Sequence, residues 1–397
     1  MQQTKPEQYQ ATGIKPDSVD GFQCTMGNCE DNCCRNTTWK ITVDKDTYEK
    51  YKTLDTKLGE HIMNCIEESG DQLVFKEFDH GHCPLLAESG LCTIHRDLGP
   101  DFLCKTCTTY PRVWNSWGGK MEYWLSLSCP DVIRWVLYRK KRINYMKFPV
   151  VSDAPVEEAT PVELEKRQVS DMLIEIAHHR KFTLKEKIIF MGLFMRSLGK
   201  SPVNETIETY RANMRKPETL KQLQSIPSTI DQNYRSDIFA ILAKAAQAAA
   251  KPPKVIPKGI KNSEYYVQIG RFNLEVADGK ADYLTDAFDR MVVPYVNDNS
   301  HVFENYLVYT IMTSSFLKEA DDYATAFAGY AGIFITMLVY TVGLFKSNQT
   351  LTHDEMIVGM YLYHRNVSHN QKFKNQLSAA FNNNLLGMLL GALGGIK

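Results

Sequence analysis

The sequence predicts an α+β protein in which a small, cysteine-rich N-terminal region precedes a mainly α-helical region. All ten cysteines lie in the first third of the 397 residues. Short alternating apolar and polar patterns, typical of half-buried strands, occur in the same third. From residue 162 onwards, apolar residues recur at helical spacing. We therefore expect a cysteine-rich domain over residues 1–147, a proline- and acid-rich linker over 148–161, and a helical domain over 162–397 with a break near 251–257.

The N-terminal elements follow from local patterns. Residues 39–43 alternate apolar and polar side chains, which predicts a short strand. Asp44 is a suitable N-cap for a helix that continues to about residue 68, with tyrosine, leucine and isoleucine on one face. Residues 73–75 and 121–125 are two further strand candidates. This region is thus expected to be a small α+β unit.

The C-terminal two thirds is expected to be a series of helices. The longest uncharged run, residues 324–345, has the length to span a bilayer, but it contains threonine, tyrosine and glycine. A buried central helix explains that mixture better, so we expect no stable membrane insertion. The predicted helices cover residues 162–180, 184–198, 217–223, 230–250, 281–296, 301–317, 321–345 and 353–367, with a last one from about 373.

Composition and missing motifs exclude several classes of function. The 46 basic and 46 acidic residues balance, which argues against a nucleic-acid-binding protein. The polar N-terminus lacks the basic-then-apolar pattern of an export signal, so we expect a cytoplasmic, reducing location. The sequence contains no dinucleotide fingerprint after a strand, no phosphate-binding loop and no serine-hydrolase elbow. Polar candidates in the helical region, expected to be solvated or satisfied core groups, are His178, His179, Glu304, Tyr306, Arg365 and His369.

The cysteine distribution predicts a metal centre in the N-terminal region. Disulfides would be reduced in the cytosol, and isolated reactive thiols would not require ten copies. Metal ligation requires several thiolates on short, turn-rich segments, which is the pattern found. Cys65 lies in a helical stretch and is expected to be a core thiol, whereas His80, His82 and His95 are expected outside the ligand shell. The clusters are Cys24–Cys29–Cys33–Cys34, Cys83-Pro with Cys92, Cys104–Cys107, and Cys129-Pro.

The spacing leaves the metal open between iron–sulfur and zinc. Tetrahedral thiolate sites suit both. Zinc fingers show paired CxxC units at regular separation, and the irregular spacing here favours an iron–sulfur cluster, with zinc as the alternative. The Cys104–Cys107 pair by itself is also compatible with a redox dithiol. A radical-type CxxxCxxC triad begins at Cys29 but fails, because its third position is Asn36.

Several short segments resemble the bacterial flagellin lysine-N-methylase family. They are Phe22-Gln-Cys24, Cys29-Glu-Asp-Asn-Cys33-Cys34, the segment 39–51, Cys83-Pro-Leu, Gly90-Leu-Cys92-Thr-Ile-His95, Thr106-Cys107-Thr-Thr-Tyr110-Pro-Arg112 and Leu127-Ser-Cys129-Pro. The cysteine-rich part is also similar to a broader group of zinc- or iron-chelating domains. In the helical region, Glu304-Asn-Tyr306-Leu and Arg365-Asn-Val-Ser-His369 agree with the family less specifically.

The resemblance implies an enzyme that transfers methyl groups from S-adenosylmethionine to surface lysines of flagellin, with participation of an iron–sulfur cluster, [4Fe–4S] being favoured. Cys104 stands where the family is expected to have serine, which argues against its being a ligand. A zinc- or iron-chelating protein without turnover is the alternative. The resemblance assigns no catalytic or S-adenosylmethionine-binding residue, and it gives ligand-like roles to Cys24, Cys29, Cys33, Cys34, Cys83, Cys92, Cys107 and Cys129.

Overall fold

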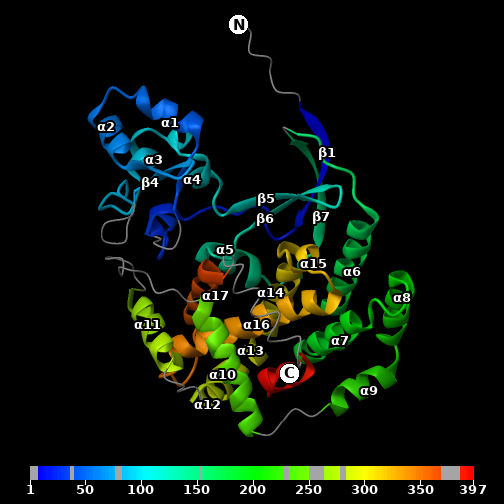
Figure 1. Ribbon diagram of the computed structural model, residues 1–397. Coiled ribbons are helices and arrows are strands. Elements are labelled where there is room, and N and C mark those ends of the chain that lie inside the picture. Colours follow the sequence, from blue (N-terminus) through cyan, green and yellow to red (C-terminus); the bar gives the residue numbers. More distant parts are fainter. Residues whose placement is uncertain are drawn as a thin grey trace.

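The structure of the protein is a computed structural model. It describes residues 8–35, 40–76, 83–152, 154–226, 232–249, 263–277, 283–367 and 385–397. Within these residues the fold is mixed α+β: two sheets lie in the N-terminal part, and helices form nearly all of the remainder (Figure 1). This confirms the predicted α+β class. The division into domains at 147 and 161 stays a prediction.

A four-stranded sheet joins the two parts of the molecule. Its strand order is β5-β6-β1-β7, with β1 parallel to β6 and antiparallel to β7. Gly118 and Gly119 connect β5 to β6 with φ of +55° and +71°, the left-handed backbone that a two-residue hairpin turn requires. The strands are β1 (Tyr9–Pro16), β5 (Arg112–Trp117), β6 (Lys120–Leu125) and β7 (Tyr145–Ser152).

Between β1 and β5 the chain builds a separate unit, which we call the small lobe (the described residues between 40 and 109). Figure 1 shows this lobe apart from the helices of the C-terminal part. It contains a three-stranded sheet of order β2-β4-β3 and its own core, which includes Tyr51, Ile62, Phe75 and Cys65. Its elements are β2 (Thr42–Val43), α1 (Lys45–Lys52), α2 (Lys57–Asn64), β3 (Ile66–Ser69), β4 (Gln72–Phe75), α3 (Thr93–Asp97) and α4 (Lys105–Thr109).

The helices from α5 onwards form what we call the helical body. Capping boxes start two of its helices, with Thr160 bonded to Glu163 and Thr183 to Glu186. Its helices are α5 (Pro130–Leu137), α6 (Pro161–Ala177), α7 (Leu184–Ser197), α8 (Val203–Asn213), α9 (Pro217–Ser225), α10 (Gln232–Ala249), α11 (Ser263–Ala277), α12 (Tyr283–Ala287), a π-helical turn (Phe288–Val292), α13 (Val293–Asp298), α14 (Ser300–Thr313), α15 (Phe316–Glu319), α16 (Tyr323–Phe345), α17 (His353–Val367) and α19 (Leu385–Leu393).

Helix α16 forms the centre of this body. In the described part of the chain it is the one helix long and apolar enough to cross a membrane, and the apolar stretch is completely buried by protein. It packs against α7, α10, α11 and α17. The prediction of a buried central helix is confirmed.

One local prediction was wrong, and a strand extends into the expected linker. The helix expected over residues 44–68 is two helices, because Thr56 accepts a hydrogen bond from Gly59 N–H and starts α2 afresh, and the strand β3 begins at Ile66. The expected linker begins inside strand β7, since residues 148–152 pair with β1. Asp44 does cap α1, accepting from Thr47 N–H at 3.1 Å. Helices α8 and α11 were not anticipated.

Candidate functional site

Seven of the eight cysteines expected to be ligands line one cavity of about 300 Å³ between the small lobe and the helical body. They come from four separate segments of the chain. The eighth, Cys83, lies beside the cavity, where its N–H donates to the carbonyl of Cys34 at 2.8 Å. All ten cysteines are free thiols, so the disulfide alternative is not supported. The seven are Cys24, Cys29, Cys33, Cys34, Cys92, Cys107 and Cys129.

The first cysteine segment is shaped by turns and side-chain caps. The thiol sulfur of Cys24 accepts from Met26 N–H at 3.3 Å, at the start of a 3-10 turn. The Asn32 carboxamide accepts from Cys34 N–H at 3.1 Å and donates to Gly90 O at 3.2 Å. One asparagine therefore fixes the Cys33–Cys34 turn and ties it to the segment that precedes Cys92.

The small lobe contributes cysteines at the starts of its short helices. Cys92 is the N-cap of α3 and Cys104 is the N-cap of α4, which also carries Cys107. A hydrogen bond from the Cys34 thiol, together with backbone N–H groups of α3, lowers the pKa of Cys92 to about 6. The Cys107 thiol similarly contacts Cys104 and lowers the pKa of that buried thiol. The first contact brings cysteines of two separate segments together, and the second pairs two cysteines of one segment.

The helical body supplies the remaining wall. Tyr309 of α14 accepts from Leu125 N–H at 2.9 Å and donates to Leu125 O at 2.6 Å, which fixes the end of β6. The chain then turns through Ser128 into Cys129, the N-cap of α5. Burial raises the pKa of both Cys129 and Cys29 to about 12. In the absence of a metal, these two thiols are therefore neutral at physiological pH.

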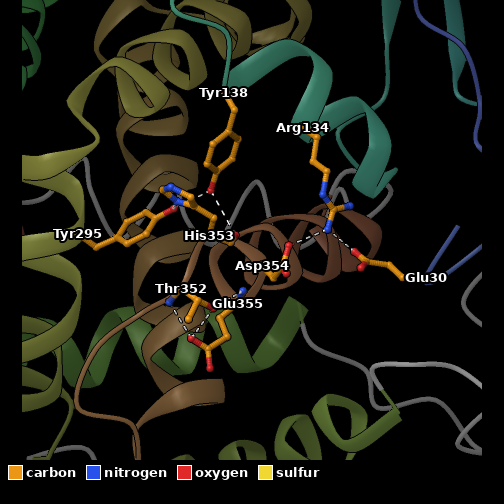
Figure 2. A network of polar contacts seen from close by, with 8 residues as sticks. All are labelled: Glu30, Arg134, Tyr138, Tyr295, Thr352, His353, Asp354 and Glu355. Carbon is orange, nitrogen blue, oxygen red and sulfur yellow. Dashed lines mark hydrogen bonds and ion pairs between the residues drawn. The ribbon is translucent and has the colours of Figure 1, made fainter.

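The cysteine loop between Cys29 and Cys33 is tied to the helical body by its two acidic residues. Figure 2 shows Arg134 of α5 between Glu30, at 2.7 Å, and Asp354 of α17, at 3.1 Å. The next residue, Asp31, is completely buried and accepts from Arg365 of α17 at 2.7 Å. Helix α17 therefore contacts the loop directly through Arg365 and is linked to it a second time through Arg134 of α5.

A second polar cluster lies beside these ion pairs. The hydroxyls of Tyr138 and Tyr295 are 2.8 Å apart, and that of Tyr295 is 2.7 Å from His353 Nδ1 (Figure 2). Thr352 and Glu355 cap the start of α17 in the same view. The cluster fixes α5 and α13 against the N-terminus of α17, and so helps to hold the wall on which Cys129 lies.

The donor set of the cavity suits a thiophilic metal. Sulfur is the shared donor of zinc and iron–sulfur sites. In the described residues, however, no three histidine, cysteine, aspartate or glutamate side chains are arranged so that they could hold a metal ion. The cavity thus gathers the required residue types without presenting a finished coordination sphere. An iron–sulfur cluster or zinc fits it by chemistry, and the ligand set stays a prediction.

The candidates that were not expected to be metal ligands lie in different parts of the molecule. Cys65 is buried in the core of the small lobe, as expected, and His95 lines the cavity. His80, His82 and His369 lie outside the described residues. The sequence indicates Arg365 as a polar candidate within a segment that resembles the family, and Asp31 and Asn32 as turn residues between cysteines. The bonds from Arg365 to Asp31 and from Asn32 to Gly90 were not predicted. The available signal was that charged or amide residues stand directly between the cysteines.

Fold and site together define a class of protein: a cysteine-lined cavity built on an α+β N-terminal part and closed by a helical C-terminal region. A family model described as the FliB lysine N-methylase C-terminal domain matches residues 170–392. That is more than half of the chain, and it includes Arg365 and all of α16. The chain belongs to the FliB lysine N-methylase family.

Relatives of this chain carry consistent names. It is 33% identical over 141 residues to a lysine-N-methylase of Salmonella typhimurium, covering 32% of each chain. It is also 33% identical over 136 residues to the flagellar biosynthetic protein FliU of Salmonella muenchen, covering 32% of this chain and 77% of that protein. The matched stretch spans about a third of the length of the lysine-N-methylases. No solved structure matches the chain.

Proposed function

We propose that this protein is a protein-lysine N-methyltransferase, which transfers methyl groups from S-adenosylmethionine to lysines of flagellin. Its cysteine-lined cavity would hold an iron–sulfur cluster, and it would act in the cytoplasm before flagellin is exported. The observation that carries the proposal is that seven cysteines from four segments line one cavity, and that this cavity adjoins the region matching the lysine N-methylase family. The names of the relatives, which refer to lysine methylation and flagellar biosynthesis, support the choice of substrate.

The net reaction sets requirements on the site. A bond between sulfur and the methyl carbon breaks, a bond between lysine nitrogen and that carbon forms, and the amine loses one proton, leaving S-adenosylhomocysteine. A neutral lysine amine is the nucleophile, so a partly desolvated site favours it by lowering the lysine pKa. Under this proposal, the apolar side chains of Met26, Leu91 and Tyr110 in the cavity wall would contribute to such desolvation. A bound iron–sulfur cluster would supply one-electron redox chemistry.

The test combines metal analysis with a transfer assay. Full-length protein purified without oxygen should be brown and contain iron and sulfide, and it should transfer label from methyl-labelled S-adenosylmethionine to flagellin lysines. Mass spectrometry of the flagellin then identifies the modified lysines. Colourless protein with stoichiometric zinc would refute the iron–sulfur part of the proposal. If metal-loaded protein transferred no label to flagellin, the proposed methyltransferase activity would be refuted.

A zinc- or iron-chelating protein without turnover is the second candidate. The sulfur-only set of predicted ligands favours it, because closed structural zinc sites commonly use such a set. The same two measurements separate the candidates, since a chelating protein would be loaded with metal and transfer no label.

A further inference from the structure

One buried cation of the helical body reaches into the cysteine site. The side chain of Arg365, in α17, is almost fully buried and lines the cavity. Its Nη1 donates to the Asp31 carboxylate at 2.7 Å, its Nη2 to Asp31 O at 2.9 Å, and its Nε to Ser128 O at 3.0 Å. The guanidinium also lies 4.7 Å from the centre of the Tyr361 ring.

The three acceptors belong to cysteine-bearing segments. Asp31 is two residues from both Cys29 and Cys33, and Ser128 directly precedes Cys129. These two segments are almost 100 residues apart in sequence, and the planar fork of one guanidinium spans them. A lysine ammonium is a point charge without this fork, so it cannot reproduce the same set of bonds.

Energetics point to positioning as the role of this ion pair. Removing two charges from water costs several kcal/mol per ion in general, and the attraction between them offsets this only with excellent geometry. A buried pair is therefore weak evidence for stability and is better understood as fixing one arrangement of the chain. The positive charge of Arg365 is balanced by the Asp31 carboxylate, so the pair adds no net charge to the cavity wall.

We propose that Arg365 is the positioning residue that completes the cysteine site, holding the Cys29–Cys33 loop and the Ser128–Cys129 turn in register. The N-terminal cysteines then bind metal tightly only when the C-terminal family region is docked against them. This rests on the proposed function only in treating the cavity as a metal site. It does not depend on methyl transfer or on the identity of the metal.

The experiment compares Arg365→Met and Arg365→Lys with a matched control in the full-length, metal-free protein. Arg235 provides that control: it is also buried, and it pairs with Asp289 at 2.5 and 2.6 Å and donates to Gly391 O at 2.9 Å, all within the helical body. Each variant is titrated with Co²⁺, and the thiolate-to-cobalt absorption is recorded. Circular dichroism checks that each variant is folded.

Both Arg365 variants should bind Co²⁺ about tenfold or more weakly than wild type, as losses of groups that orient metal ligands generally do. The Arg235→Met protein should bind as wild type does, although it is destabilised. Equal Co²⁺ affinity in wild type and Arg365→Met would overturn the proposal. If Arg365→Met does not fold, the Co²⁺ affinity of Arg365→Lys, which retains the charge, is compared with that of wild type instead.

A second readout keeps the outcome clear if wild type binds no Co²⁺, which would refute the metal part of the proposed function. Alkylation of the metal-free protein is then followed site by site by mass spectrometry. Loss of the Arg365 bonds should accelerate alkylation of Cys29, Cys33 and Cys129 relative to Arg235→Met. Unchanged rates at these three positions would overturn the role of Arg365 independently of any metal.

Discussion

The small lobe and the helical body are stabilised in different ways. The helical body is built around α16, whose residues from Ala326 to Phe345 are buried. The small lobe has a core of only ten buried residues, three of which are cysteines. Hydrophobic burial scales with apolar area, so the lobe gains much less from it. With so small a core, the lobe is expected to rely more on contacts with neighbouring segments and, under the proposed function, on bound metal.

The largest expected effect comes from removing one cavity thiol. Cys107→Ser should abolish or greatly reduce metal content, because Cys107 lines the cavity among the predicted ligands. Cys65→Ser is the matched control in the same lobe, since Cys65 is buried in the core and does not line the cavity. Metal analysis of both purified variants makes the comparison. Equal metal content would contradict the distinction between ligand and core thiols.

Cys104→Ser tests whether the Cys104–Cys107 pair acts as a redox dithiol. It should retain metal and activity, because the proposed function assigns Cys104 no ligand role. A redox protein that uses Cys104 and Cys107 as a dithiol would instead lose all activity. The transfer assay and metal analysis on this single variant therefore discriminate between the two.

In the helical body, stability is expected to fall when a buried side chain is removed from the core. Leu338→Ala on α16 removes a completely buried side chain and should lower the free energy of unfolding by about 3 kcal/mol. Denaturant unfolding of the metal-free protein measures this change. Amide hydrogen exchange should then show faster opening of α16 and its neighbours. If the small lobe opened equally, the two regions would form one cooperative unit and the comparison would fail.

Acid should destabilise the helical body through His364. Burial lowers the pKa of this imidazole from 6.5 to about 3, and Tyr306 lies 2.9 Å from its Nε2. The folded state keeps the ring neutral, whereas the unfolded state takes up a proton below pH 6.5. Stability is thus complete above pH 6.5 and falls by about 1.4 kcal/mol per pH unit towards pH 3. Unfolding curves of wild type and His364→Gln across this range should differ in slope, and parallel curves would contradict the assignment.

The smallest expected effect is at a helix start. Thr183 accepts from Glu186 N–H, and the Glu186 carboxylate accepts from Thr183 N–H at 2.7 Å. Thr183→Ala removes one of these two bonds and should cost about 1 kcal/mol of stability. Thermal unfolding measures the loss, and Thr183→Ser should restore most of it. Metal content should remain unchanged in both variants.

Sequence patterns predicted elements with strong local signals and missed those that depend on distant partners. Asp44 and the buried α16 could be predicted because capping and apolar composition are local properties. Residues 148–152 resembled a linker because Pro149 and acidic neighbours follow, yet pairing with β1 makes them a strand. The gathering of cysteines was indicated by their clustering. The bond from Arg365 to Asp31 spans 334 residues, and no local pattern encodes it.

The position of β1 inside its sheet has a consequence for how the chain is made. Its parallel neighbour β6 and its antiparallel neighbour β7 are both synthesised more than a hundred residues later. During translation the first strand must therefore wait without partners while the whole small lobe emerges and can fold. The lobe is inserted in the sequence between β1 and β5, two strands that β6 separates in the sheet. Trimming the chain before Asp17 would leave β6 and β7 with no strand between them, although it would remove no helix or strand of the lobe.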